Sequence, residues 1–539
     1  MENSNDSPKY EVHFHGKAVG VAIGDNARVV WSQTTGHHLV PPMPPSSWVD
    51  REQEIGLLKD ALTKGHPVAI WGPGGIGKTA LAAKIASECK DIVGGIQNVA
   101  WFEIREDQGL DDLQNNLIIH FGEELNELEQ STRFDRVRAL LSAQSRLLVF
   151  DQCENLQQQE EYFIKWLESL PIGTRILLAG RHQPLFGNAL QPLNSLAIEE
   201  SIKLFQSVAL EAGLREAPAA ELVRPICETL AGYPLAIRLA APISKLGNIS
   251  ALRTQIETTG LSGVDAALTI SYDTLNDNQK KHFRSLGLVT LPFDLGAVEI
   301  ICELTTSDAA IYCAELTRRA LLSFDETLNL YDMHPLIRRY AQSKVGIEET
   351  PETKNIHNRI ANYYLSKQSK GLTPEQIFAY CDHLDKSERY DEIVDVLGQI
   401  DDTLAKHGYW NELTNLWERV VVHIDSFSTP EQKINAWNGL AIMYHLQSRW
   451  EKSLKAFNQI LELDSDLKWH EIYVQSLLNM GTAYTNIGSL DKAYEVLTKA
   501  KDLSREWELR SFEPDALLDI GKIHECRRAD EQALVGRLA

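Results

Sequence analysis

The chain has 539 residues, of which 43% are hydrophobic and 24% are charged, and its formal net charge is −22 at pH 7. This length exceeds what a single hydrophobic core usually serves, so we expect about three or four domains. The negative charge argues against nucleic acid as the main partner, because binding a polyanion depends on cationic side chains that release counterions.

Two classes of protein are disfavoured by further features of the composition. The seven cysteines contain no C-x-x-C pair, which argues against a disulfide framework and against a zinc site. No apolar run reaches the roughly 18 residues that span a bilayer, and the first residues lack the basic and apolar regions of a secretory signal. We therefore expect a soluble, cytoplasmic protein with no membrane partner.

The first segment, residues 1–46, combines a patterned stretch with a linker. Residues 9–31 alternate small and β-branched side chains around Gly16, Gly20 and Gly24, which predicts a glycine-rich β-hairpin or a few short strands. The proline-rich stretch that follows, as far as residue 46, fits neither a helix nor the interior of a sheet. The next domain is therefore expected to begin at residue 47.

Residues 72–79 read GPGGIGKT and fit the phosphate-binding pattern G-x-x-x-x-G-K-[ST] between an apolar run and a helix-compatible run. The glycines allow the turn that points successive N–H groups at phosphate oxygens. Lys78 supplies a charge for the β- and γ-phosphates, and Thr79 supplies a hydroxyl for Mg²⁺. The pattern predicts a site for ATP or ADP with Mg²⁺. The residues expected to contact nucleotide here are Gly72, Gly74, Gly75, Ile76, Gly77, Lys78, Thr79 and Ala80.

Four apolar runs alternate with helix-compatible segments between residues 47 and 190, and they lie at 68–71, 99–104, 146–150 and 174–180. Short apolar runs separated by helices are typical of a parallel sheet that is buried on both faces. We therefore predict an α/β nucleotide-binding domain over 47–190.

The ends of two of these runs supply the rest of a catalytic set with Lys78. Asp151 follows the run at 146–150, where its carboxylate can hold Mg²⁺ together with Thr79. Gln152 comes next, and its amide can orient a water but cannot accept a proton, so we expect slow ATP hydrolysis. Arg181 ends the following run, where its cation can sense the γ-phosphate.

Beyond residue 190 the apolar residues recur at i, i+3 and i+4, which predicts a helical domain over 191–262. The segment 263–348 combines helices with a short hairpin. From residue 349 onward the pattern is almost entirely helical, and we expect a helical linker over 349–430.

The tail, residues 431–539, repeats with a period of 40, as Tyr444, Tyr484 and His524 show. Equivalent positions that are expected to hold turns between paired helices are Gly408, Ser448, Gly488 and Arg528, and those that require close packing are Leu413, Ser453, Ala493 and Ala533. The pattern resembles tetratricopeptide repeats (TPRs), with a plain helical bundle as the alternative. Such stacks present a concave surface, here expected to bind a protein or peptide ligand. The last repeat is expected to stop inside its second helix, as a truncated array would.

Six motifs follow the phosphate-binding loop in a fixed order, and they are RLLVFDQ, GTRILLAGR, LNSLAIEESIKLF, AGYPLAI, ISYDTLNDNQKKHF and YDMHP. Their order over about residues 47–345 resembles the NB-ARC branch of the STAND signalling ATPases. The resemblance implies a winged-helix domain over 263–348. It also implies an ADP-bound resting state that exchanges to ATP on sensing a ligand and then self-associates to activate an effector. A role in prokaryotic immunity is an expectation from the family alone.

The resemblance implies four further nucleotide contacts. Val49 and Arg51 match the segment that contacts adenine, Pro234 matches a proline that packs on the base, and His334 matches a histidine that touches the β-phosphate of ADP. The alternatives are that Pro234 only kinks a helix and that His334 is an ordinary interface residue. Pro335 stands where the family has an aspartate, so the contact made by that aspartate is not expected.

The first segment and the rival functions complete the expectations. GVAIGDNARVV, within 9–31, looks like motifs that form signalling amyloids in this class, through which a downstream effector would be engaged; a small hairpin is the alternative. The charges of 263–348 are mixed, so we do not expect DNA binding. The rival functions are a transcription regulator of the STAND class, which needs a helix-turn-helix, and a nucleotide-binding TPR scaffold that does not switch.

Overall fold

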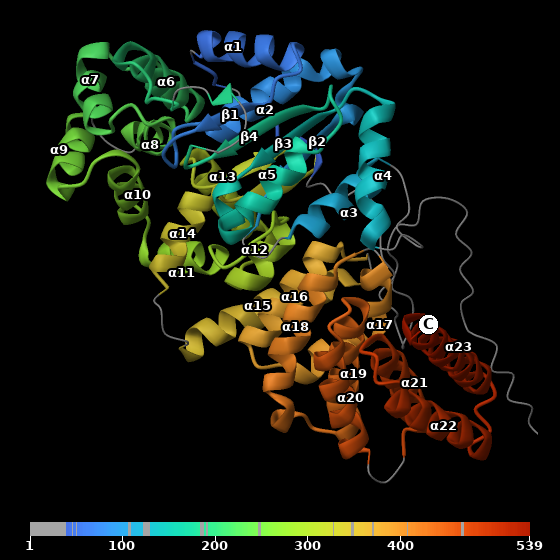
Figure 1. Cartoon of the computed structure of the whole chain (residues 1–539). Helices are drawn as coiled ribbons and strands as arrows, with labels where there is room; N and C mark the ends of the chain where they lie inside the picture. The colour runs from blue at the N-terminus through green and yellow to red at the C-terminus, as the bar shows by residue number, and fades with distance from the viewer. Residues whose placement is uncertain are drawn as a thin grey trace, which may run out of the picture. The chain divides into compact units, whose positions relative to one another are not determined.

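The computed structural model divides into two compact units, Met1–His383 and Leu384–Ala539 (Figure 1). The residues that it describes are 39–45, 47–49, 51–105, 109–121, 130–183, 188–189, 192–245, 249–326, 328–345, 350–368, 371–406, 408–464 and 468–538. The strands expected within 9–31 lie outside this part of the chain.

A parallel five-stranded sheet forms the centre of the first unit, with the strand order β2-β3-β4-β1-β5. Its strands are β1 (Val68–Trp71), β2 (Val99–Glu103), β3 (Leu147–Asp151), β4 (Arg175–Gly180) and β5 (Asn188–Ala189). The first four coincide with the apolar runs, and this confirms the expected α/β fold class with a parallel sheet. The two-residue β5 was not expected.

Helices cover both faces of this sheet, as Figure 1 shows. Their bounds are α1 (Glu52–Thr63), α2 (Lys78–Cys89), α3 (Leu110–His120), α4 (Gln130–Ala143) and α5 (Glu160–Glu168). Side chains alternate along each strand, so Phe102 and Phe150 join the core formed with α3, α4 and α5, whereas Trp101 and Val149 join the core formed with α1 and α2. Two hydrophobic cores therefore hold the sheet in place.

The rest of the first unit is helical apart from one hairpin. Its helices are α6 (Ile198–Glu211), α7 (Ala220–Thr229), α8 (Pro234–Ala240), α9 (Ile249–Thr259), α10 (Gly263–Asp273), α11 (Asp277–Leu286), α12 (Leu295–Cys302), α13 (Thr306–Arg318), α14 (Pro335–Ser343) and α15 (Pro351–Lys367). The expected hairpin is present as antiparallel β6 (Ser323–Asp325) and β7 (Leu330–Asp332). Helix α16 (Pro374–Lys386) crosses the division between the units.

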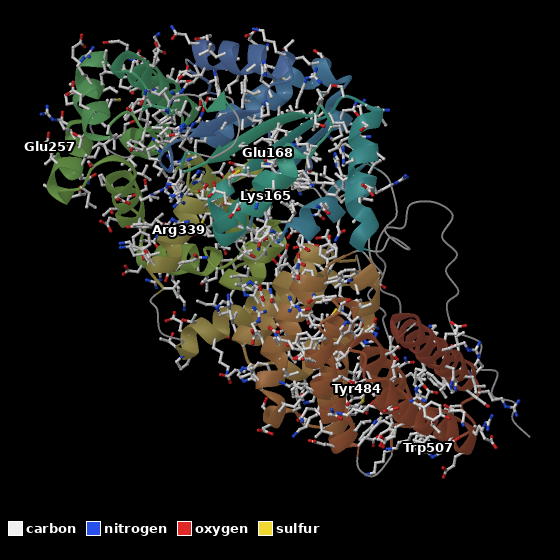
Figure 2. All side chains as sticks on the ribbon, in the orientation of Figure 1. Lys165, Glu168, Glu257, Arg339, Tyr484 and Trp507 are labelled. Carbon is white, nitrogen blue, oxygen red and sulfur yellow. The ribbon has the colours of Figure 1, made fainter. Side chains whose placement is uncertain are left out.

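The second unit is an array of antiparallel helix pairs. The helices are α17 (Tyr390–Lys406), α18 (Trp410–Val422), α19 (Pro430–Leu446), α20 (Trp450–Leu463), α21 (His470–Asn486), α22 (Leu490–Glu506) and α23 (Phe512–Leu538). Left-handed residues turn the chain between partners, with φ 86° at Gly408, 57° at Ser448 and 82° at Gly488. Aromatic contacts join successive helices, such as His470 stacked on Trp507 with ring centroids 4.0 Å apart. Trp507 is labelled in Figure 2.

The expected turn at Arg528 is absent, because α23 continues from Phe512 to Leu538 without a break. The stretch ECRRADEQAL contains no glycine, proline or asparagine, and most of its residues are strong helix formers. An arginine in the left-handed conformation would also cost about 1–2 kcal/mol. The prediction that the last repeat stops inside a second helix is therefore wrong, and the 40-residue alignment does not predict the turn at this position.

Candidate functional site

The glycine-rich loop connects the carboxyl end of β1 to the first turn of α2. Two backbone hydrogen bonds anchor its start: Gly72 N donates to Gly180 O at 3.3 Å, and Leu193 N donates to Trp71 O at 2.7 Å. Gly77 has φ 99° and precedes the helix directly, a conformation that strongly favours glycine. The first N–H groups of α2, like those of any helix, have no partner within the helix, and an anion site requires such free donors.

Three helices that follow the sheet in sequence pack against this loop. A Cβ placed on Gly74 would lie 3.2 Å from Leu336 Cδ1 in α14, and one on Gly75 would lie 3.0 Å from Val264 Cγ2 in α10. Leu235 N in α8 donates to Gly75 O at 3.3 Å. The conformation of the phosphate-binding loop is therefore tied to the positions of α8, α10 and α14.

Pro234 is the first residue of α8, so it begins a helix and does not kink one. A turn with positive φ at Ala231 and Gly232 delivers it there, and proline suits this position because its missing N–H needs no partner. A Cβ on Gly77 would lie 3.9 Å from Pro234 Cγ. The proline therefore lies beside the loop, and its packing on the base of a nucleotide stays a prediction.

Lys78, Thr79 and Asp151 come together at the carboxyl edge of the sheet. Lys78 Nζ donates to Gly72 O at 2.9 Å and to Pro73 O at 3.0 Å, so its side chain curls back over the loop. Burial lowers the pKa of Lys78, which the charges of Glu154 and Asp151 oppose. Thr79 Oγ1 donates to Asp151 Oδ2 at 2.7 Å. Burial raises the pKa of Asp151 to about 6, since only 2% of the residue is exposed.

Gln152 has a left-handed backbone with φ 59° and a fixed side chain. Its N–H donates to Asp151 Oδ1 at 2.9 Å, and its amide Nε2 donates to Glu103 Oε1 at the end of β2. Asn155 N donates to Gln152 O at 2.9 Å. A non-glycine residue in this conformation stores strain, a feature that gathers at functional sites.

Arg181 follows β4 and is paired with Glu154. Its Nε lies 2.9 Å from Glu154 Oε1, and its N–H donates to Glu154 Oε2 at 3.1 Å. The positive charge of Arg181 contributes to the lowered pKa of Lys78. The arginine expected to sense the γ-phosphate is thus paired with a carboxylate that sequence reasoning missed.

His334 precedes α14 and caps it, because Nδ1 accepts a hydrogen bond from Leu336 N at 3.2 Å. His334 is exposed by its surface area, but many protein atoms lie around its imidazole. The desolvation that these atoms cause, with the charges of Arg338 and Lys78, lowers the pKa of His334 to about 4. The ring is therefore neutral at pH 7, and its Nε2 carries the proton because Nδ1 accepts.

Arg51 and Val49 lie before α1. The Arg51 guanidinium is buried and donates to Asn194 O at 2.7 Å and to Ile76 O at 3.4 Å, and it forms an ion pair with Glu54 at 3.0 Å. Through Ile76 it braces the phosphate-binding loop. Val49 is half-buried and follows Trp48, which packs on the core beneath α1.

These residues fit a nucleotide with Mg²⁺. A carboxylate and a hydroxyl oxygen are ligand types that Mg²⁺ prefers, so Asp151 and Thr79 would hold the ion. A Cβ on Gly72, Gly74 or Gly75 would lie 3.0–3.2 Å from a neighbouring atom, so these positions suit glycine. Lys78 would place a positive charge beside the phosphates. Sequence reasoning missed Glu103 and Glu154. The signal for Glu103 is its place at the end of an apolar run, where parallel strands gather polar side chains.

Within the described ranges, no helix combines the length and apolar character needed to cross a membrane.

Comparisons with known proteins identify two regions of the chain. Residues 51–215 match the NB-ARC domain, and residues 432–534 match the tetratricopeptide repeat. "TMV resistance protein N" of Nicotiana glutinosa is 24% identical over 314 residues, which are 56% of this chain and 27% of that protein. "Disease resistance protein RUN1" of Vitis rotundifolia is 24% identical over 54% of this chain and 22% of that protein. The chain thus spans about a quarter of the length of these relatives.

Two further matches have different descriptions. An HTH-type transcriptional regulator of Mycobacterium bovis is 25% identical over 344 residues, which are 59% of this chain and 38% of that protein. Among solved structures, a STAND protein with a tetratricopeptide repeat sensor from Pyrococcus horikoshii matches with a TM-score of 0.49 and 16% identity, covering 92% of this chain and 83% of that one.

Proposed function

This chain carries an NB-ARC domain followed by tetratricopeptide repeats, as the motifs predicted, and we propose that it is a nucleotide-dependent signalling switch. In this proposal the resting protein holds ADP, the repeats sense a ligand, and exchange for ATP leads to self-association. The proposal includes a helical domain over residues 191–262 and a winged-helix domain over residues 263–348.

The observation that carries the proposal is the packing of α14 on the phosphate-binding loop. A Cβ on Gly74 would lie 3.2 Å from Leu336, and Lys78 influences the pKa of His334, which begins the same helix. A nucleotide on the loop would therefore also meet α14. Occupancy of the loop and the position of α14 are then coupled, which is what a switch needs.

Each residue of the set has a distinct task. Lys78 places a positive charge at the phosphates, and Thr79 with Asp151 would orient Mg²⁺, which supplies charge neutralisation when bound. His334 is neutral and can donate its Nε2–H to a phosphate oxygen, while its Nδ1 is committed to Leu336 N. In this proposal His334 donates its hydrogen bond when ADP is bound, and this hydrogen bond is lost when ATP is bound.

The test compares ADP and ATP affinities of wild-type protein and of His334→Asn by calorimetry, with Mg²⁺ present. Asparagine is a good N-cap, so α14 keeps its cap while the imidazole is lost. A nucleotide shifts an equilibrium only by its differential affinity for the two states. The proposal therefore predicts that ADP affinity falls by about tenfold, the value of one hydrogen bond, while ATP affinity changes much less.

An equal fall in both affinities would show that His334 does not distinguish the nucleotides, and it would contradict the switch. Unchanged affinity for ADP would remove His334 from the site. Arg339→Asn is the matched control, because Arg339 lies exposed on the same helix (Figure 2) and should change neither affinity.

The repeats and the output of the switch belong to the same proposal. Stacked repeats present an extended surface to other chains, so a protein or peptide ligand on 431–539 is the expected signal. Disease resistance and transcriptional regulation both occur among the relatives' names. A transcription regulator is therefore the second candidate. Salt-dependent binding of ATP-loaded protein to duplex DNA would favour it.

A further inference from the structure

Glu103 ends β2 directly beside the aspartate that would hold Mg²⁺. The two parallel strands pair in register, with Glu103 opposite Asp151. Trp101 and Val149 face α2, and side chains two residues further along a strand face the same way. Glu103 and Asp151 therefore both project toward the face that carries Thr79. Unlike Asp151, Glu103 is exposed at this edge of the sheet.

The strained residue next to Asp151 is held against Glu103. The side chain of Gln152 donates its Nε2–H to Glu103 Oε1, and its Oε1 faces Asn155 Nδ2 at 3.5 Å. Asn155 Nδ2 also donates to Ile104 O at 2.8 Å, directly after Glu103 in the chain. These contacts orient the amide and use one carboxylate oxygen of Glu103, a residue that is exposed at this edge of the sheet.

The other carboxylates near the loop are already committed. Asp151 accepts from Thr79 Oγ1 at 2.7 Å and is buried, as a metal ligand would be. Glu154 is paired with Arg181, whose Nε lies 2.9 Å from it. Among the described acidic residues that act on Asp151, Glu103 is thus the exposed one without an ion-pair partner.

We propose that Glu103 is the general base of ATP hydrolysis and that Gln152 positions it, an inference that rests on the proposed nucleotide site. A water oxygen forms a bond to the γ-phosphorus, and the proton of that water passes to the Glu103 carboxylate. The bond from the γ-phosphorus to the bridging oxygen breaks, and its electron pair leaves on ADP. The proton then passes to the released phosphate.

The test uses the full chain and measures two quantities separately. Equilibrium dialysis with a non-hydrolysable ATP analogue and Mg²⁺ gives binding, and single-turnover conversion of ATP to ADP and phosphate gives hydrolysis. Glu103→Gln should keep binding within about threefold and slow hydrolysis by about a hundredfold, the usual contribution of a general base. Glu168→Gln removes an exposed charge from the end of α5 (Figure 2) and should change neither.

Exchanging the two residues separates catalysis from structure. Glu103→Gln combined with Gln152→Glu returns a carboxylate to the same pair of side chains. The double variant should hydrolyse ATP within about tenfold of the wild-type rate, and so faster than Glu103→Gln alone. Wild-type rates in Glu103→Gln would overturn the inference, as would a double variant no faster than the single one. Failure of wild-type protein to bind the analogue would instead overturn the proposed function.

Discussion

The two units of this chain use contacts of different range. In the first unit the Thr79–Asp151 hydrogen bond joins residues that are 72 positions apart, and Leu336 of α14 approaches the loop at Gly74 from still further along the chain. In the second unit Ser453 Oγ donates to Ala441 O, 12 positions away, and Gln447 Nε2 donates to Thr414 Oγ1 of the neighbouring helix pair, 33 positions away. The site depends on the whole first unit, whereas each repeat depends on its neighbours.

This difference separates chemistry from packing in the predictions. A change at the loop should alter nucleotide binding and leave the repeats folded. A change between repeats should lower the stability of the array and leave the phosphate-binding loop intact.

The largest expected effect comes from Lys78→Ala. Loss of a charged hydrogen-bond donor is worth about 1.5–3 kcal/mol, so ADP and ATP affinity should fall by roughly tenfold to a hundredfold or more, measured by calorimetry. Lys165→Ala is the control, since Lys165 lies exposed on α5 (Figure 2) and forms an ion pair with Glu161 on the same helix. Wild-type affinity in Lys78→Ala would contradict the role of this loop.

Gly439→Ala should destabilise the repeats. A Cβ on Gly439 would lie 2.3 Å from Cε2 of Trp417, a residue that is only 1% exposed, so neighbouring side chains would have to shift to admit it. Such overpacking costs about 1–3 kcal/mol, which exceeds the gain of about 1 kcal/mol from replacing a helical glycine. Urea unfolding followed by circular dichroism measures the loss, and nucleotide affinity should not change.

Gly521→Ala is the matched control for that substitution. It also replaces a glycine inside a helix, but nothing lies within 4 Å of the added Cβ. It should stabilise the array by about 0.5–1 kcal/mol. Equal effects of the two substitutions would show that close contact at Gly439 is not what limits the array.

Asp151→Asn should make the first unit more stable when Mg²⁺ and nucleotide are absent. Because the folded pKa of about 6 lies above the ordinary 3.8, the wild-type carboxylate opposes folding above pH 6, and this cost disappears as the pH falls from 6 toward 3.8. At pH 7.5 the substitution should add about 1–3 kcal/mol of stability and weaken binding of Mg²⁺ with ATP. Asp60→Asn, at an exposed ion pair, should do neither.

Gly75→Ala compared with Gly173→Ala isolates the packing of the loop on α10. Both glycines have positive φ, 79° and 107°, so either alanine is strained. Only at Gly75 would the Cβ also meet Val264 Cγ2, at 3.0 Å. Gly75→Ala should therefore cost about 1 kcal/mol more in thermal unfolding, and it should lower nucleotide affinity. The same loss in both variants would argue against tight contact between loop and helix.

Features that depend on neighbouring residues in the sequence could be predicted, whereas features that depend on contacts between distant residues could not. Four strands were located because fully buried strands are continuous apolar runs. Helix α4 was not, because its sequence QSTRFDRVRALLSA is largely polar, and β5 is too short to carry a pattern. The turn expected at Arg528 was wrong because a period in the sequence does not by itself break a helix that strong helix formers continue.

The site shows the same limit. Lys78, Thr79 and Asp151 stand in local motifs, so roles could be proposed for them from the sequence, and Thr79 and Asp151 do meet, in a hydrogen bond of 2.7 Å. The place of Glu103 depends on β2 pairing with β3 in register, which no local pattern encodes. The contact of α14 with the loop likewise depends on tertiary packing, and only the family resemblance anticipated His334.

The most direct test of the switch is to denature freshly purified protein and chromatograph the nucleotide that it releases. The account predicts ADP in a near-stoichiometric amount, held by the loop and by α14. Protein that releases no nucleotide and also fails to bind added ATP with Mg²⁺ would contradict it, and would favour a repeat scaffold in which the loop no longer serves binding.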